Sequence, residues 1–516
     1  MIRTIIKREC LDNILSFKFM ACVLVAIILS IISVVFLTND YQARLKDYRT
    51  GVTINEESMK HVPVYSHLAL KVFKKPNPLS IFVTGIDRET GTYADINHRD
   101  IPASLRGGSI KNEFSHMFSF FDLSSIILII FTLLGILLSY NAISGEKEEG
   151  MLSLALSNAV PRYKLLLGKY LGILISLVAP LTLLFLSGIL IVVLSSDAEV
   201  NAAFFSSLAL FYVSSLLYLS SIVLIGLFVS ARTSRSFVSL LVLLSFYLIT
   251  VFLLPLAVNG YADRQISLRT RYFEKSLQSL TDERGKAVEQ VYIKYRAPRT
   301  WLLPSSNARL MKRITPPEYL EYYKKIYPIN ERIMEEYAVK INALREIDDA
   351  AAVMIRRWRN AILAVMPSTN FARIADLTAE TGEAGFLRFV GRLKTYWQSY
   401  VRYLDEKDAF GLRYFYPYPE EFTAQEKNLI ERIKEDYVRD NGRIYRGKYL
   451  EEALGINPEI RNLDLSDFPE FNFQPRSVSE KTGAALLNIL GLVSYSFIFF
   501  LLAHFSFNRY DPRKDA

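Results

Sequence analysis

Six long apolar runs constrain the fold of this 516-residue chain more than any other feature. An α-helix rises about 1.5 Å per residue, so roughly 20 apolar residues cross the hydrocarbon core of a bilayer. Each of the six runs is long enough to do so. The chain is therefore expected to be a mostly α membrane protein. The predicted spans are residues 19–38, 118–140, 170–194, 203–229, 237–258 and 482–507.

The composition agrees with a membrane protein and argues against a nucleic-acid-binding one. Hydrophobic residues make up 51% of the chain, which is too many for an ordinary soluble protein. The net charge is +9, but 61 Lys and Arg are spread along the chain beside 52 Asp and Glu. The only cysteines are Cys10 and Cys22, so no disulfide framework is available to the segments outside the predicted spans.

The distribution of basic residues predicts how the spans are oriented. Lys and Arg occur in residues 1–18, 141–169 and 508–516 and in the short connection "SARTSRS", whereas the connection "SSDAEVN" has none. The positive-inside rule therefore predicts that the basic connections and both termini are cytoplasmic. The first run is too long for the core of a signal peptide, so it is read as a retained anchor.

Two long segments, residues 39–117 and 259–481, then fall on the extracytoplasmic side. The larger one contains helix-start signals and apolar residues every three to four positions, so we expect a large helical domain. The smaller one contains the apolar run "SIFVTGID" and several Gly and Pro residues. This run predicts a short strand in a small α+β or irregular unit.

No catalytic motif is found in the sequence. There is no P-loop pattern, and the five histidines lack the spacing of metal ligands. The centres of the spans contain no acid or base, and Asp122 lies at an outer end. Ion-coupled transporters generally need such a residue at membrane depth, so the energy for any transport is expected to come from a partner.

The connection 141–169 stands out because charged residues and glycines separate two apolar spans. It is either a solvated loop at the membrane surface or a short docking helix that presents charge and apolar side chains to a cytoplasmic subunit. Leu152 and Leu156 are one helical turn apart and would form an apolar knob that enters a groove on that subunit. Glu146 and Glu148 are two residues apart, so they are expected to serve different neighbours, one capping the segment and the other reaching the partner.

The stretch "ISGEKEEGMLSLALSNAVPRYKLLLGKYLG" resembles the signature that follows the second span of ABC-2-type permeases. Met151 and Ser153 depart from it, standing where Thr and Glu are usual. The resemblance implies a type V, ABC-2-like exporter fold, in a subfamily that has a large extracytoplasmic insert between spans five and six and includes gliding-motility permeases. It also implies which residues couple to an ATPase, namely Gly145, Glu146, Lys147, Glu148, Gly150, Leu152, Leu156, Pro161 and Arg162.

The resemblance further implies the setting in which the chain works. It would be a non-enzymatic permease in the bacterial cytoplasmic membrane, paired with a second permease, identical or paralogous, and with two cytoplasmic ATPase subunits that hold ATP and Mg²⁺. It would export a substrate or do work on the periplasmic side. An alternative is a non-transporting scaffold or mechanotransmission protein whose outer domain recruits a periplasmic or surface partner.

Overall fold

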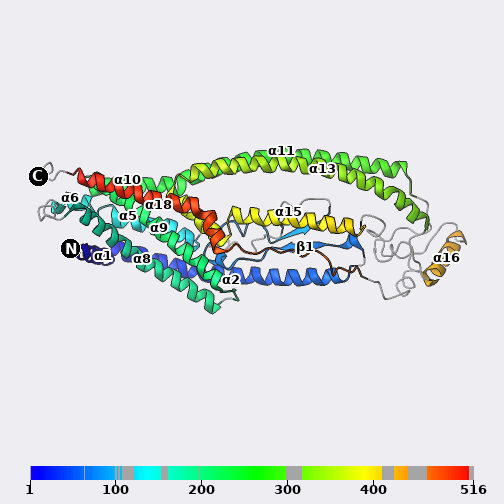
Figure 1. Ribbon diagram of the computed structural model, residues 1–516, viewed down its shortest axis with the longest axis horizontal. Coiled ribbons are helices and arrows are strands. Elements are labelled where there is room, and N and C mark those ends of the chain that lie inside the picture. The colour runs from blue at the N-terminus through cyan, green and yellow to red at the C-terminus, as the bar shows by residue number, and fades with distance from the viewer. Residues whose placement is uncertain are drawn as a thin grey trace.

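The computed structural model describes residues 2–510 except 63, 99–101, 103–104, 107–120, 153–160, 196, 298–316, 410–423 and 440–461. The molecule is elongated and mostly helical (Figure 1). Helix α1 (Ile2–Ile14) and the C-terminal end of α18 (Val478–Asn508) lie at one end of the molecule together with α6 (Ser144–Glu148). The strand β1 (Leu70–Phe73) and the helices α15 (Glu383–Glu406) and α16 (Ala424–Arg439) lie toward the opposite end.

The structure contains, in the described residues, six helical segments that are long and apolar enough to cross a membrane, as predicted. The second and fifth each include a π-helical stretch, η3 and η4. The spans are α2 (Phe17–Lys60); α4 (Leu123–Ile126), η3 (Ile127–Phe131) and α5 (Thr132–Ser139); α8 (Arg162–Ser195); α9 (Ala202–Arg232); α10 (Ser236–Tyr247), η4 (Leu248–Leu253) and α11 (Leu254–Lys294); and α18 (Val478–Asn508).

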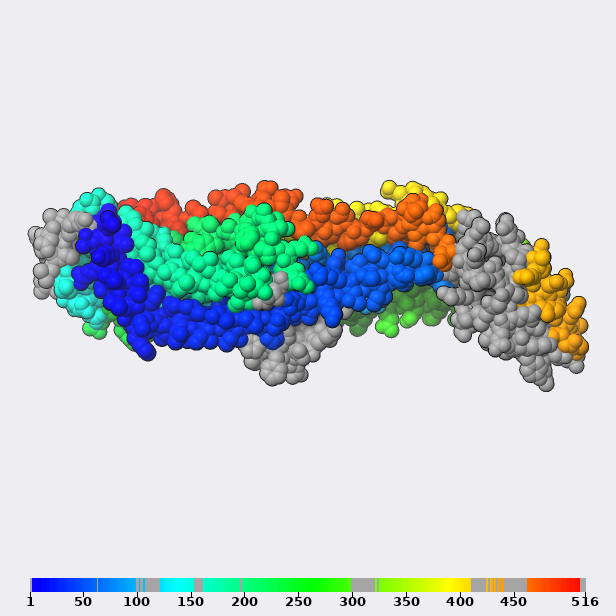
Figure 2. Space-filling model, turned by 90° about the horizontal axis from the view of Figure 1, so that it is seen from below, coloured from blue at the N-terminus to red at the C-terminus, as the bar shows by residue number. Residues whose placement is uncertain are grey.

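Two of these spans continue as helices far beyond their apolar parts. Helix α2 has 44 residues, and the segment from α10 to α11 has 59. Figure 2 shows α2, in blue, running past the green spans into the part of the molecule beyond them, which we call the outer part. The domain boundaries expected at residues 39 and 259 therefore fall inside continuous helices. The change from apolar to polar sequence marks where a helix leaves the apolar region, but it does not end the helix.

The outer part combines a long helical hairpin with a smaller mixed unit. Helices α11 and α13 (Pro317–Leu363) lie side by side (Figure 1), and Arg269 and Asp348 approach to 3.9 Å between them. In the mixed unit β1 pairs antiparallel with β2 (Tyr93–Ile96). The buried face of α15 packs with these strands in one apolar core that includes Phe389. A large helical portion and a small α+β unit are thus both present.

The predicted strand "SIFVTGID" is wrong. Its first residues lie in a short 3₁₀ helix, η2 (Pro78–Ile81), which Asn77 caps by accepting a hydrogen bond from the Leu79 amide at 3.0 Å. Phe82 is fully buried and its ring lies 6.2 Å from that of Phe204 in α9. The run is apolar because it packs against the ends of the spans, and a short apolar run does not by itself distinguish a strand from other buried structure.

One helix of the segment 259–481 packs among the spans and not outside them. Helix α14 (Pro367–Ala379) places Phe371 on Tyr218, with ring centroids 4.8 Å apart, near the middle of α9. Ser368 Oγ donates a hydrogen bond of 2.8 Å to the carbonyl of Thr250 in η4. The expectation that 259–481 forms a purely outer domain therefore needs correction at α14, which belongs to the same apolar core as the spans.

The short helix α1 (Ile2–Ile14) packs against the start of α8. Two glycines of α8 make this close approach feasible, since a Cβ at Gly168 would lie 2.6 Å from Ile5 and one at Gly172 would lie 2.6 Å from Glu9. A pair of small residues four apart lets helices approach closely. The N-terminal helix is therefore held directly on the third span.

Candidate functional site: the connection between the second and third spans

The described part of the connection 141–169 lies at the same end of the molecule as α1 and the C-terminal end of α18 (Figure 1). Its described parts are α6, the residues up to Leu152, and the start of α8 at Pro161 and Arg162. Three of its charged side chains, Lys147, Glu148 and Arg162, contact the ends of other helices of the same chain. These contacts define how the segment is connected to the spans.

Lys147 and Glu148 hold the two helix ends that meet between spans four and five. The Lys147 ammonium donates hydrogen bonds to the carbonyls of Ala231 and Thr233, the latter at 3.0 Å, at the C-terminal end of α9. A Glu148 carboxylate oxygen accepts a hydrogen bond of 3.0 Å from the amide of Ser236, the first residue of α10. A cation at a helix C-terminus and an anion at an N-terminus are both favoured by the helix dipole.

Arg162 holds the end of the sixth span in the same way. Its Nη1 donates to the carbonyls of Phe507, Asn508 and Tyr510 at 3.1, 2.7 and 2.9 Å. These carbonyls are at the C-terminal end of α18, where no following helical turn supplies donors. The Lys147 ammonium also lies 5.0 Å from the ring of Tyr510, so the contacts at the ends of α9 and α18 adjoin each other.

Glu146 takes part in a buried ion network with α8 and α1. The side chain of Lys169 is only 4% exposed, and its ammonium lies 2.7 Å from Glu146 and 3.4 Å from Glu9. Burial raises the pKa of Glu9, although the nearby ammonium opposes this effect. Because Lys169 is buried, its charge has to be compensated nearby, and Glu146 and Glu9 supply carboxylates at this position. Glu146 and Glu148 thus serve different neighbours, as their spacing predicts.

Gly150 and Pro161 shape the connection, whereas the position of Gly145 would also accommodate a Cβ. Gly150 has a φ of +72°, a conformation that glycine adopts without strain, and it ends α6. A Cβ at Gly145 would be at ordinary contact distances of 3.5 and 3.6 Å from Asn141 and Ser236. The carbonyl of Pro161 accepts hydrogen bonds from the amides of Lys164 and Leu165 in the first turn of α8.

The expectation that Leu152 inserts into a groove on a partner is wrong in this structure. Leu152 is fully buried and packs with Leu165, Leu166 and Ala231 of the chain itself. Leu156 lies outside the described residues. Instead, the preceding Met151 is 45% exposed, and Glu149 and Gly150 are exposed beside it. The apolar side chain that a partner could contact is thus at position 151 and not at position 152.

Two residues of this site were not anticipated. Ser230 Oγ in α9 accepts hydrogen bonds from the amides of Ile143 and Ser144 at 3.0 and 2.9 Å, which fixes the start of α6. Glu9 completes the network around Lys169. Nothing in the sequence marks Ser230 among the many serines of the spans. Glu9, however, is an acid in a basic N-terminal segment, and this contrast in charge could have indicated that it pairs with a basic residue of another segment.

Comparison with known proteins identifies the family. A family described as ABC-2 family transporter protein matches residues 3–280, which is more than half of the chain. The match covers α1, the first five spans and the connection 141–169, and it ends within α11. Among curated proteins, none matches the chain. The chain therefore belongs to the ABC-2 family of transporter proteins and is a permease component of an ABC transporter, a class that is not itself catalytic.

Proposed function

We propose that this permease couples ATP hydrolysis by a separate ABC ATPase to export or to work on the far side of the membrane, and that residues 141–169 receive the movement of that ATPase. The family implies an ABC ATPase partner. In this proposal two ATPase subunits hold ATP and Mg²⁺, the membrane is the bacterial cytoplasmic membrane, and both termini and α6 face the cytoplasm. The lack of charged residues at the span centres supports an external energy source.

The observation that carries this proposal is that three charged residues of the connection contact three different helix ends. Lys147 binds the end of α9, Glu148 the start of α10, and Arg162 the end of α18. A displacement of the connection would therefore pull directly on spans four, five and six. The exposed residues 149–151 are the surface that we assign to the ATPase.

The burial of the spans favours particular faces for a second permease, identical or paralogous. The most apolar part of α9 is 67% buried within one chain, whereas that of the fifth span is 17% buried and that of α18 is 11% buried. Spans with so few buried residues inside one chain must have their exposed faces covered by lipid or by another protein. We propose that the second permease covers part of the exposed faces of spans five and six and that lipid covers the rest.

The long helices offer a route from the connection to the outer part. The 59 residues from α10 to α11 correspond to about 88 Å of helix, nearly three times the thickness of a bilayer core. Glu148 contacts the first residue of this segment. A tilt imposed at Ser236 would therefore move the outer hairpin of α11 and α13.

This continuity also favours a second candidate function, in which no substrate crosses the membrane. In that function the ATPase would move the outer hairpin so that it acts on a periplasmic or surface partner protein. The two candidates share the same transmission and differ only in whether a substrate is translocated.

The transmission can be tested without knowing the substrate. The permease with Cys10 and Cys22 replaced would be reconstituted with its ATPase, and spin labels would be attached at Ser279 in α11 and Ser399 in α15. We expect ATP with Mg²⁺ to change the distance distribution between the labels. The change should be lost in Arg162→Gln, because α18 is then no longer held, while the ATPase remains bound.

Lys164→Gln is the matched control, because Lys164 lies in the same turn and its described contact is with the ring of its neighbour Tyr163. It should respond to ATP like the wild type. A full response to ATP in Arg162→Gln would contradict the proposed transmission. A translocation assay with candidate substrates then separates the two functions, since the second predicts movement of the labels without transport.

A further inference from the structure

A row of exposed apolar side chains runs along α13, on one face of the outer hairpin. Ile347, Met354, Trp358 and Val365 follow one another at intervals of seven, four and seven residues, so they lie on the same face of the helix. All four are exposed, Met354 at 74% and Ile347 at 64%. Single exposed apolar side chains are common, but a contiguous row of them marks an interaction surface.

A second row on α11 adjoins the first. Leu254, Tyr261 and Leu268 are seven residues apart, Tyr272 follows four residues later, and all four are exposed. The ring centroids of Tyr261 and Trp358 are 5.3 Å apart, so the two rows lie on the same side of the hairpin. We call these eight residues the hairpin stripe.

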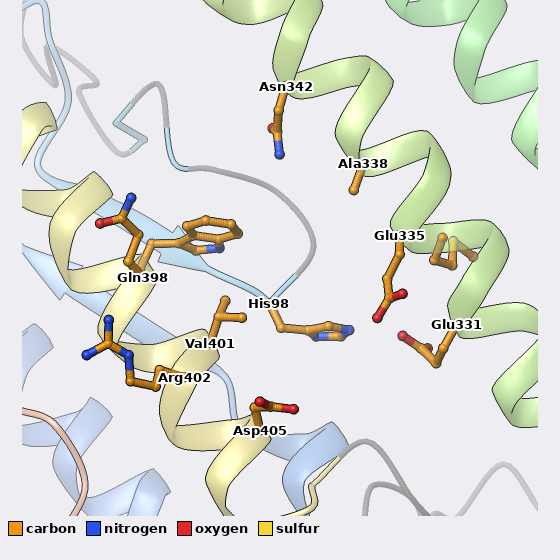
Figure 3. A pocket seen from close by; sticks show the side chains of 11 residues that line it. His98, Glu331, Glu335, Ala338, Asn342, Gln398, Val401, Arg402 and Asp405 are labelled. Atoms are coloured by element: carbon orange, nitrogen blue, oxygen red, sulfur yellow. The ribbon is translucent and has the colours of Figure 1, made fainter.

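The hairpin stripe faces away from α15. On the side of α13 toward α15, Ala338 and Asn342 line a cavity of about 450 Å³ between the two helices (Figure 3). Ile347 comes nine residues after Ala338, which is about two and a half helical turns, so it points to the opposite side. Helices α11 and α15 thus cover two faces of α13, and the stripe occupies a third.

Lipid can cover only the inner end of the hairpin stripe. The fifth predicted span ends at residue 258, and Tyr261 and Trp358 lie just beyond it, at the level where Trp and Tyr are enriched in membrane proteins. Tyr272 is eleven residues farther along α11, which is about 17 Å of helix. Ile347 comes eleven residues before Trp358 on the antiparallel α13, so it is at about the same height. Both side chains are in water unless another protein covers them.

The chemistry of the stripe suits contact with an identical stripe. About a two-fold axis each side chain meets its own copy or a near neighbour, so a charged residue would be repelled. The stripe contains no charged residue, whereas exposed charged residues flank it, among them Arg264, Glu346 and Arg357. Two copies inserted in one membrane in the same orientation also hold their stripes at the same height. The seven-residue spacing is the one with which parallel helices pack as coiled coils.

We propose that the hairpin stripe binds the same stripe of a second copy of this chain, so that the permease is a homodimer joined both within the membrane and outside it. The stripe continues outward from the fifth span, whose most apolar part is only 17% buried within one chain. This inference rests on the proposed pairing of two permeases, and it adds the identity of the partner and the surface that pairs. It does not require the proposed coupling to the ATPase.

Cross-linking of the full-length protein in membranes tests the contact. In a protein with Cys10 and Cys22 replaced by Ser, single cysteines would be introduced as Tyr272→Cys, Ile347→Cys and Met354→Cys and treated with a short bis-maleimide. We expect each to give a product of twice the chain mass that contains only this chain. Glu274→Cys is the matched control, because Glu274 is exposed but lies on the opposite side of α11 from Tyr272. It should give little product.

A charge placed in the stripe should separate the two hairpins. In the Tyr272→Cys protein, adding Ile347→Glu should lower the yield of product about tenfold, because it brings two carboxylates together at the height of the cysteines. Adding Ser267→Glu should leave the yield unchanged, since Ser267 is exposed but lies off the stripe. Gel filtration and the far-UV spectrum would establish that these variants are folded.

Four results would each overturn the proposal. These are the absence of the product at all three stripe positions, equal product from Glu274→Cys, an unchanged yield with Ile347→Glu, and a product that joins this chain to a different protein. The response of the spin labels to ATP is measured separately. A normal response without cross-linking would refute the homodimer contact alone, and cross-linking without a response would refute the transmission alone.

Discussion

Replacing Leu152 by Ala should destabilise the permease itself and not merely loosen its hold on a partner. Leu152 is fully buried in a cluster that draws residues from several spans. At about 0.8 kcal/mol per buried carbon, loss of the three-carbon isopropyl group removes roughly 2.4 kcal/mol, and the cavity left behind brings the expected loss into the range of about 2 to 5 kcal/mol. For the exposed Met151, Met151→Ala should change the free energy of unfolding by about 0.5 kcal/mol or less.

The assay compares the two variants in the absence and presence of the ATPase. Thermal unfolding of the purified permease in detergent should show a lower midpoint for Leu152→Ala and a wild-type midpoint for Met151→Ala. Co-purification with the ATPase should weaken for Met151→Ala, because that side chain lies on the exposed surface assigned to the partner. A Leu152→Ala protein of wild-type stability that fails to bind the ATPase would refute the reasoning and place Leu152 at the interface.

Three further predictions concern the topology, the N-terminal helix and the outer hairpin. Single cysteines at Ser234 and Ser279 should react with impermeant reagents from opposite sides of the membrane, and reaction from one side would contradict the topology. Gly172→Leu should displace α1 from α8 and make Cys10 react faster with thiol reagents, because the added side chain would meet Glu9; an unchanged rate would argue against this packing. Replacing residues 270–347 by a short loop should preserve membrane insertion and ATPase binding, because α14 is retained, but should abolish function; a fully active deletion would show that the hairpin is dispensable.

The sequence predicts the spans well because their signal is local. An apolar run of sufficient length has few alternatives in a membrane, and all six predicted runs coincide with long apolar helices. The apolar runs do not predict where these helices end. Residues after position 38 are polar yet continue α2 to Lys60, since helix propensity does not change when a chain leaves the apolar region.

In the candidate site, too, the sequence predicts local features but not the contacts of single side chains with distant parts of the chain. The spacing of Glu146 and Glu148 indicates that they have different neighbours, but those neighbours, Lys169 and Ser236, are set by how distant spans pack. The position of α14 is also a tertiary result. Its sequence is amphipathic like the outer helices, and its contacts in the structure, such as the stacking of Phe371 on Tyr218 and the hydrogen bond from Ser368 to Thr250, reveal that it lies among the spans.

The contact between Arg162 and the end of α18 has a consequence for biosynthesis. It joins residues 345 positions apart in the chain. At a synthesis rate of about 5 to 20 residues per second, between roughly 17 and 70 s pass after Arg162 is made before its partner carbonyls exist. Throughout that interval the connection lacks at least this one of its three helix-end contacts. An ATPase that recognises the completed arrangement would therefore avoid engaging a nascent permease, and a chain truncated before α18 would never present the finished surface.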